Sequence, residues 1–73
     1  MEIYEVVATI PGDPTIGVYD SDIRVIFEDG YTIDNKEDET YLIKTVCDFA
    51  MSHYGDCGKI KLLNFDGNQV WIR

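Results

Sequence analysis

The pattern of apolar and polar residues predicts one helix in the middle of the chain, at about residues 36–54. At 100° per residue, the apolar side chains of this stretch gather on one face and its charged side chains on the other. Gly55 follows where helices often end in a left-handed residue, and Asp34 with Glu37 predicts a capping box at the start. The face that we expect to be buried contains Leu42, Val46, Ala50 and His53.

Shorter runs before the helix predict β-strands. Residues 2–10 alternate between two partly apolar faces, and residues 23–28 form a second β-type run. Between these two runs, the Pro-, Gly- and Asp-rich stretch predicts a loop or bulge. Asp29 and Gly30 predict a tight hairpin turn into a short third strand at residues 31–33.

The last part of the chain, about residues 59–73, predicts a second hairpin, with Asp66, Gly67 and Asn68 at its turn. A two-residue loop would mix apolar and charged side chains on both faces, whereas a three-residue loop separates them. We prefer the second register, which places four apolar residues on one face: Ile60, Leu62, Val70 and Ile72. The other face would carry Leu63, Phe65, Trp71 and Arg73 beside Lys59 and Lys61.

That second face would be an unusually apolar patch on a monomer. Another strand, the loop at residues 11–22 or a second copy of the chain are the alternatives that would cover it.

These elements predict one α+β domain that occupies residues 1–73. We expect an antiparallel sheet of four or five strands, in the order β-β-β-α-β-β, with one helix packed across it. A chain of 73 residues has room for one hydrophobic core, so the helix must cover the sheet.

The chain is strongly acidic, with a formal net charge of −8 at pH 7. Residues 1–58 hold thirteen acids against three bases, a net charge of −10, whereas residues 59–73 hold three bases against one acid, a net charge of +2. Most of the surface therefore repels nucleic acid and anionic membranes, so we expect neither as a direct partner.

Nothing in the sequence predicts a membrane segment or a secretion signal. No apolar run reaches the ~20 residues of a membrane span, and the first ten residues lack the basic start of a signal peptide. We therefore expect a cytoplasmic protein, in the host cytoplasm if a phage encodes it.

Two cysteines and one histidine are the candidates for site chemistry. Cys47 lies two turns inside the predicted helix and Cys57 just beyond its end, so a disulfide would require the chain to double back by about 10 Å. We therefore expect two reduced, partly buried thiols. His53, in the last helical turn, is expected to be a half-buried structural imidazole. The spacing of these residues matches no common zinc site, and we expect no metal and no cofactor.

The remaining motifs give no support for catalysis. The acidic turn at Asp20 and Asp22 begins like a calcium loop but reaches Arg24 where an oxygen ligand is needed. Neither a phosphate-binding glycine loop nor a nucleophile elbow occurs. A 73-residue chain also has little room for the ~300–1,000 Å³ cleft of a catalytic site, so we expect no enzymatic activity.

The strongest functional signal is a dense group of acids near the predicted short hairpin and the helix start. Its members are Glu28, Asp29, Asp34, Glu37, Asp38 and Glu39. Asp20 and Asp22 are second choices, which join the group if the following strand brings them to the same end of the sheet. Such a surface attracts a cationic groove over a Debye length of ~8 Å and speeds association. The alternative is that these acids only cap the helix and keep a small protein soluble.

The sequence thus predicts a non-enzymatic binding protein, in the role of an inhibitor, that occupies the basic surface of a nucleic-acid-binding partner. Its size and acidity are like those of small phage inhibitors, including anti-CRISPR and DNA-mimic proteins, although no motif carries that analogy. The alternative is a structural module that forms a homodimer through the terminal hairpin, with Leu63, Phe65, Trp71 and Arg73 at the interface.

Overall fold

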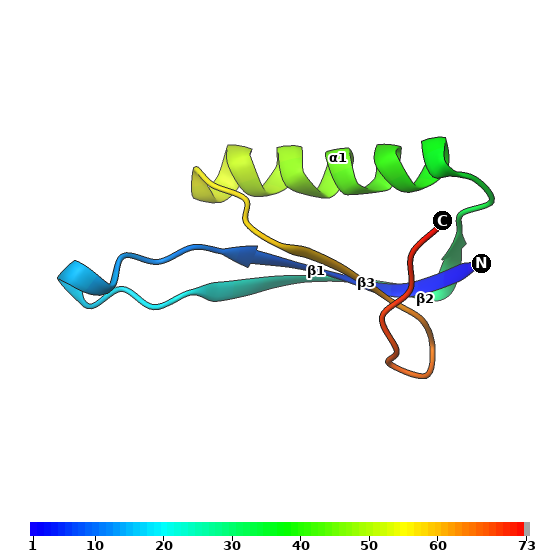
Figure 1. The fold of residues 1–73 in the computed structure, drawn as a ribbon, viewed down its shortest axis with the longest axis horizontal. Coiled ribbons are helices and arrows are strands. Elements are labelled where there is room, and N and C mark those ends of the chain that lie inside the picture. Colours follow the sequence, from blue (N-terminus) through cyan, green and yellow to red (C-terminus); the bar gives the residue numbers. More distant parts are fainter. Residues whose placement is uncertain (73) are drawn as a thin grey trace.

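The computed structural model describes residues 1–72 and has two layers, a β-sheet and a helix that covers one of its faces (Figure 1). The described residues form a three-stranded antiparallel sheet in the order β2-β1-β3. The helix α1 spans Lys36–Tyr54, and a 3₁₀ turn, η1 (Pro14–Ile16), interrupts the loop between the first two strands. The strands are β1 (Glu2–Ile10), β2 (Ser21–Thr32) and β3 (Ile60–Leu63). The α+β class is confirmed, but the predicted strand number and order are wrong.

β1 is the central strand, and its inward side chains form the middle of the core. Val6 lies opposite Val25 of β2 and Leu62 of β3, so the three side chains share the face that α1 covers. Full burial of a side chain of this size stabilises the fold by about 1.5–3 kcal/mol. The buried core cluster is Ile3, Val6, Ala8, Ile33, Leu42, Val46 and Leu62.

Residues 21–32 form one long, bent strand instead of the predicted hairpin. β1 pairs Glu5 with Ile26 but Ile3 with Tyr31, so four residues of β2 lie opposite a single residue of β1. This irregularity is a bulge, which bends the strand and carries its last residues toward the start of α1.

Gly30 explains why the turn signal produced a bulge. Its φ of +84° is the left-handed conformation that a tight turn also requires. A Cβ at this position would lie 3.1 Å from the Phe65 ring and closer still to the Glu2 carboxylate. The Asp29-Gly30 pair therefore marks a bend over which Phe65 packs, and the prediction of a hairpin turn was wrong.

The helix has the predicted bounds, but its N-cap lies one residue later than expected. Asn35 Oδ1 accepts a hydrogen bond from the Asp38 N–H at 2.9 Å, and Asp38 Oδ2 accepts one from the Asp34 N–H at 3.1 Å. These two hydrogen bonds cap the start of the helix, the role that we predicted for Asp34 and Glu37. Gly55 ends the helix in the left-handed conformation, with φ +77°, as predicted.

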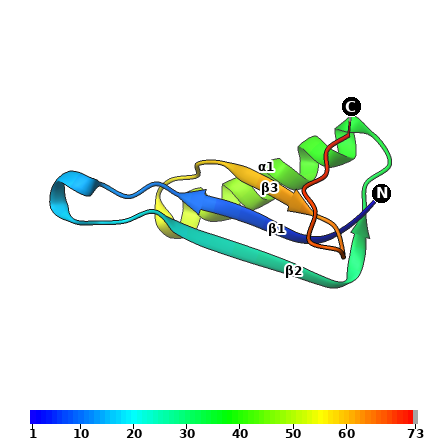
Figure 2. The same ribbon diagram turned by 60° about the horizontal axis from the view of Figure 1, so that its bottom comes forward.

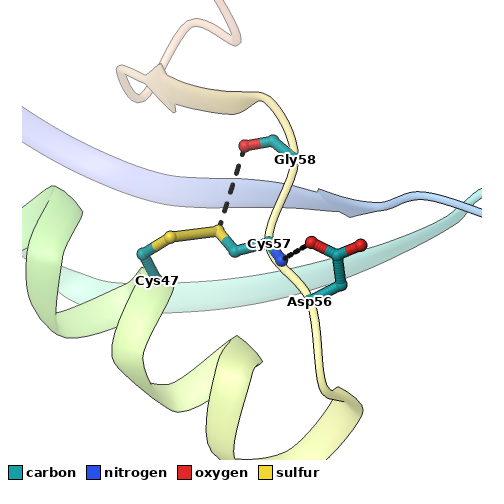
Figure 3. Close-up of a disulfide and its surroundings, with 4 residues drawn as sticks. All are labelled: Cys47, Asp56, Cys57 and Gly58. Atoms are coloured by element: carbon teal, nitrogen blue, oxygen red, sulfur yellow. Dashed lines mark hydrogen bonds between the residues drawn. A yellow bond between two sulfur atoms is a disulfide. The ribbon is translucent and has the colours of Figure 1, made fainter.

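A disulfide between Cys47 and Cys57 connects the last turns of α1 to the segment that leads into β3 (Figure 3). The two Cα atoms lie 5.6 Å apart, a usual distance for a bridged pair. The expectation of two reduced thiols was wrong because the left-handed Gly55 turns the chain back beside the helix at once. Gly58 continues this return, and its N–H donates to the Thr9 carbonyl of β1 at 2.7 Å.

The chain after β3 turns back and pairs with that strand without forming a regular one. Leu63 bridges Gln69, and the Val70 N–H donates to the Leu62 carbonyl at 2.9 Å, which leaves residues 65–67 as the loop. The loop thus has the preferred length of three residues, one position earlier than expected. Beside the buried Leu62, three apolar residues pack against the core from this region: Ile60, Val70 and Ile72.

Candidate functional site: an acidic end of the molecule

Five of the predicted acidic residues lie in the bent part of β2, in the first turn of α1 or in the connection between these elements, at one end of the molecule. We call this group the acidic end: Glu28, Asp29, Asp34, Glu37 and Asp38. All are exposed except Asp38, which is partly buried because its carboxylate caps the helix. The two elements converge at this end in both views of the ribbon (Figures 1 and 2).

Two of these acids stabilise the start of the helix through their place in the sequence. Glu37 and Asp38 occupy the first turn of α1, where the unpaired backbone N–H groups and the helix dipole stabilise negative charge. Their mutual repulsion is therefore partly offset within the fold. The carboxylates can stay exposed and ionised without unfolding the end of the helix.

Described cations do not neutralise the acidic end. The three ion pairs within residues 1–72 use other carboxylates: Arg24 with Glu5, Lys36 with Glu39, and Lys44 with Asp48. Lys36 begins α1 at this same end, but its ammonium is directed to the buried Glu39 at 2.8 Å. The local surface potential is accordingly dominated by the acids.

Glu39 was predicted to belong to this group and does not, because only 1% of its surface is exposed. Its two oxygens accept hydrogen bonds from the Lys36 ammonium and the Ile72 N–H. Lys36 also donates to the Ile72 carbonyl at 3.3 Å. The signal that could have found this is helical spacing, since Glu39 lies three residues before Leu42 on the buried face.

The environment of Glu39 favours its ionised form. Burial by itself raises the pKa of this carboxyl, but the hydrogen bonds from Lys36 and the Ile72 N–H, with the charge of Lys36, lower its pKa below the ordinary value. Glu39 is thus a structural anchor that ties the C-terminal segment to the first turn of α1.

Asp20 and Asp22 lie at the opposite end of β2 from the bend, so they do not join the acidic end. Asp20 Oδ1 accepts a hydrogen bond from the Gly12 N–H at 2.8 Å, and Asp22 Oδ1 accepts one from the Thr9 hydroxyl at 3.2 Å. Both carboxylates hold the base of the loop between β1 and β2. Their grouping with the other acids depended on a strand direction that the structure does not have.

The alternative interface on the terminal hairpin is partly used inside the chain. Phe65 packs on Tyr4, with ring centroids 5.0 Å apart, although 54% of Phe65 remains exposed. Leu63 is partly buried, and Trp71 is 39% exposed. The prediction for Arg73 lies outside the described residues.

A groove between α1 and β2 is a feature that the sequence did not indicate. Its volume is about 430 Å³, so the expectation that the chain has little room for a cleft of this size was wrong; the lining is apolar and aromatic apart from Thr45. It forms because α1 lies over β1 rather than over β2. The lining includes Val25, Phe27 and Tyr31 of β2 and Tyr41, Val46 and Phe49 of α1. Such a surface fits an apolar contact and supplies no acid–base pair for chemistry.

His53 is exposed and not half-buried as expected. Its ring packs at a tilt against that of Phe49, with centroids 4.3 Å apart, in the last turns of the helix. Within residues 1–72, no three His, Cys, Asp or Glu side chains are grouped so that they could hold a metal ion. None of the described helices is both long and apolar enough to cross a membrane.

Comparisons of the chain with protein-family models, with curated proteins and with solved structures give no match. Among the chain's own described residues, the acidic end combines five carboxylates that take part in none of the three described ion pairs.

Proposed function

We propose that this protein is a non-enzymatic binding protein that inhibits a partner by occupying its basic, nucleic-acid-binding surface. The observation that carries the proposal is the acidic end, where β2, α1 and the connection between them contribute five carboxylates to one end of the molecule while the described ion pairs use other acids. The removal of Glu39 from the group leaves Glu28, Asp29, Asp34, Glu37 and Asp38 as the proposed contact residues.

The attraction between the acidic end and such a partner is electrostatic. Surfaces that bind nucleic acid carry Lys and Arg spaced to meet phosphates, and a concentrated group of carboxylates competes for the same cations. Attraction of this kind acts over about a Debye length, so the association should be fast at low salt and weaken as salt is added. Nucleic acid should displace the protein from its partner for the same reason.

The test is affinity capture from a nuclease-treated lysate of the host cell, with washes at about 50 mM and about 500 mM salt. The nuclease empties basic grooves that nucleic acid would otherwise fill. We expect a nucleic-acid-binding protein that is retained at low salt, released at high salt and displaced by added DNA or RNA.

A pair of double variants gives the matched comparison. Asp29→Lys with Glu37→Lys reverses two exposed charges of the acidic end, whereas Asp48→Lys with Asp56→Lys makes the same change in net charge elsewhere. Only the first variant should lose the partner. Equal retention by both variants, each folded by circular dichroism, would rule out the acidic end as the contact surface.

A further inference from the structure

The two edges of the sheet differ in how they are covered. The outer edge of β3 is paired with the returning C-terminal segment, through the Leu63–Gln69 bridge and the hydrogen bond from the Val70 N–H. The outer edge of β2 has no paired segment among the described residues, as its place at the end of the strand order shows (Figure 2). A long open edge with free backbone groups is a template for another strand.

The hydrogen bonds of β1 show which β2 residues present those groups. The Thr9 N–H donates to Lys59 at 2.8 Å, and the Thr9 carbonyl accepts from Gly58, so Thr9 is directed toward β3. Because the backbone N–H and C=O groups of successive residues point to alternate sides of a strand, those of Ala8 and Val6 point toward β2. The backbone groups of their partners in β2 point back at β1, and the backbone groups of the β2 residues between those partners point outward, away from the sheet. Those with free N–H and C=O groups are Asp22, Arg24 and Ile26.

We propose that β2 pairs with β2 of a second copy, antiparallel about a two-fold axis at Ile26, to form a continuous six-stranded sheet. In this register Arg24 of each copy lies opposite Glu28 of the other, and the two Ile26 side chains meet on the same face. On the face toward α1, Val25 of each copy lies opposite Phe27 of the other. Opposite charges and apolar side chains are therefore matched on both faces.

Other registers would use the same outward-pointing backbone groups but would not pair opposite charges on one face and apolar side chains on the other. Pairing about Val25 sets Asp22 of one copy against Glu28 of the other, and pairing about Arg24 sets two arginines face to face. Pairing about Ile23 does oppose Asp22 to Arg24, but it leaves the apolar residues that follow Val25 outside the contact. The alternation of exposed and partly buried side chains along β2 continues to Glu28, and the irregular part of the bulge at Asp29 and Gly30 limits how far the pairing can extend.

The apolar groove supports a second copy as the occupant of this edge. It runs beside β2, and Val25 and Phe27 form part of its lining. On its other side, Tyr41 is 66% exposed and Phe49 46% exposed. A second β2 added here brings its own Val25 and Phe27 beside the groove, and the two-fold axis repeats the contact. Exposed aromatic surface on both copies is thereby removed from water.

The first measurement is sedimentation of the full chain over about 1 μM to 1 mM, with hydrogen exchange at both ends of the range. We expect a concentration-dependent dimer, because one strand pair and a small apolar contact give modest affinity. Protection of the Arg24 and Ile26 amides should rise with concentration, while the Val25 amide, bonded within the sheet, stays protected throughout. A single monomeric species at 1 mM, or an Ile26 amide that exchanges equally fast at both concentrations, would overturn the proposal.

Glu28→Lys tests the register. It places a lysine opposite Arg24 twice in each dimer, so the dissociation constant should rise by about tenfold or more. Asp66→Lys makes the same charge change in the loop beyond β3 and should leave dimerisation unchanged. An unchanged dimer in folded Glu28→Lys would exclude pairing about Ile26. Glu28 belongs to both proposals, so the inhibitor function is tested separately through Asp29 and Glu37, and either proposal can fail without the other.

Discussion

The two ends of α1 are fastened to the rest of the molecule by different chemistry. At the N-terminal end, the buried Glu39 carboxylate holds the Lys36 ammonium and the Ile72 N–H. At the C-terminal end, the Cys47–Cys57 disulfide joins the helix to the start of the β3 segment. One attachment is ionic and the other covalent.

The difference matters because the helix covers only part of the sheet. α1 packs over β1 and leaves the groove beside β2 open, so apolar contact with the helix covers only part of the sheet. Attachments at the ends compensate for this incomplete cover. The ionic one should respond to pH and the covalent one to reductant. Disulfides persist mainly in oxidising compartments, so this bond weighs against the cytoplasmic location, which stays a prediction.

The largest effect should come from removing the covalent attachment. Cys47→Ser with Cys57→Ser should lower the free energy of unfolding by about 2–3 kcal/mol, because the bridge restricts the unfolded chain over a separation of 10 residues. Urea unfolding of the oxidised protein and the variant measures the difference. Reductant should bring the wild type to the level of the variant. Two free thiols in the native protein, found by alkylation and mass spectrometry, would contradict the disulfide.

Removing the charge of the ionic attachment should have a somewhat smaller effect. Glu39→Gln keeps the shape of the side chain but weakens the bonds to Lys36 and Ile72, so we expect a loss of about 1–2 kcal/mol at pH 7. The folded-state pKa of Glu39 lies below its unfolded value, so the contribution of its charge is present above the unfolded pKa. It disappears as the pH falls through the folded pKa.

Urea midpoints of the wild type and Glu39→Gln, measured from about pH 7 to pH 3, should therefore converge as the pH falls. Glu37→Gln is the matched control, since Glu37 lies in the same helical turn but is exposed. It should change stability little at any pH. A difference in urea midpoint between the wild type and Glu39→Gln that does not change with pH would show that the charge of the carboxylate does not hold the C-terminal segment.

The smallest of the three effects concerns the cap beside the ionic attachment. Asn35→Ala removes the acceptor for the Asp38 N–H and should cost about 1 kcal/mol, measured as a lower thermal midpoint. Asp34→Ala should cost less, because the Asp34 side chain is not the cap of this helix. The opposite ranking of the two variants would restore the cap position that the sequence first suggested.

Local features of this protein could be predicted from the sequence because their causes are local. The bounds of α1, its acidic first turn and the left-handed Gly55 follow from side chains within one or two helical turns of each other. The apolar pattern also predicted which side of the terminal segment packs against the core. Three of the six primary acids of the proposed site, Asp34, Glu37 and Asp38, lie beside these local signals and remain exposed or at the helix cap.

Tertiary structure decided the rest, because the relevant partners are far apart in the sequence. The burial of Glu39 is supported by an N–H from Ile72, 33 residues later, and the bend at Gly30 is covered by the ring of Phe65. The open edge of β2 exists because β3 returns to the other side of β1. A periodic pattern states which face of an element is apolar, but it does not state which other element will cover that face. That choice depends on long-range packing, and here it separates the charges that hold the fold from those that remain exposed.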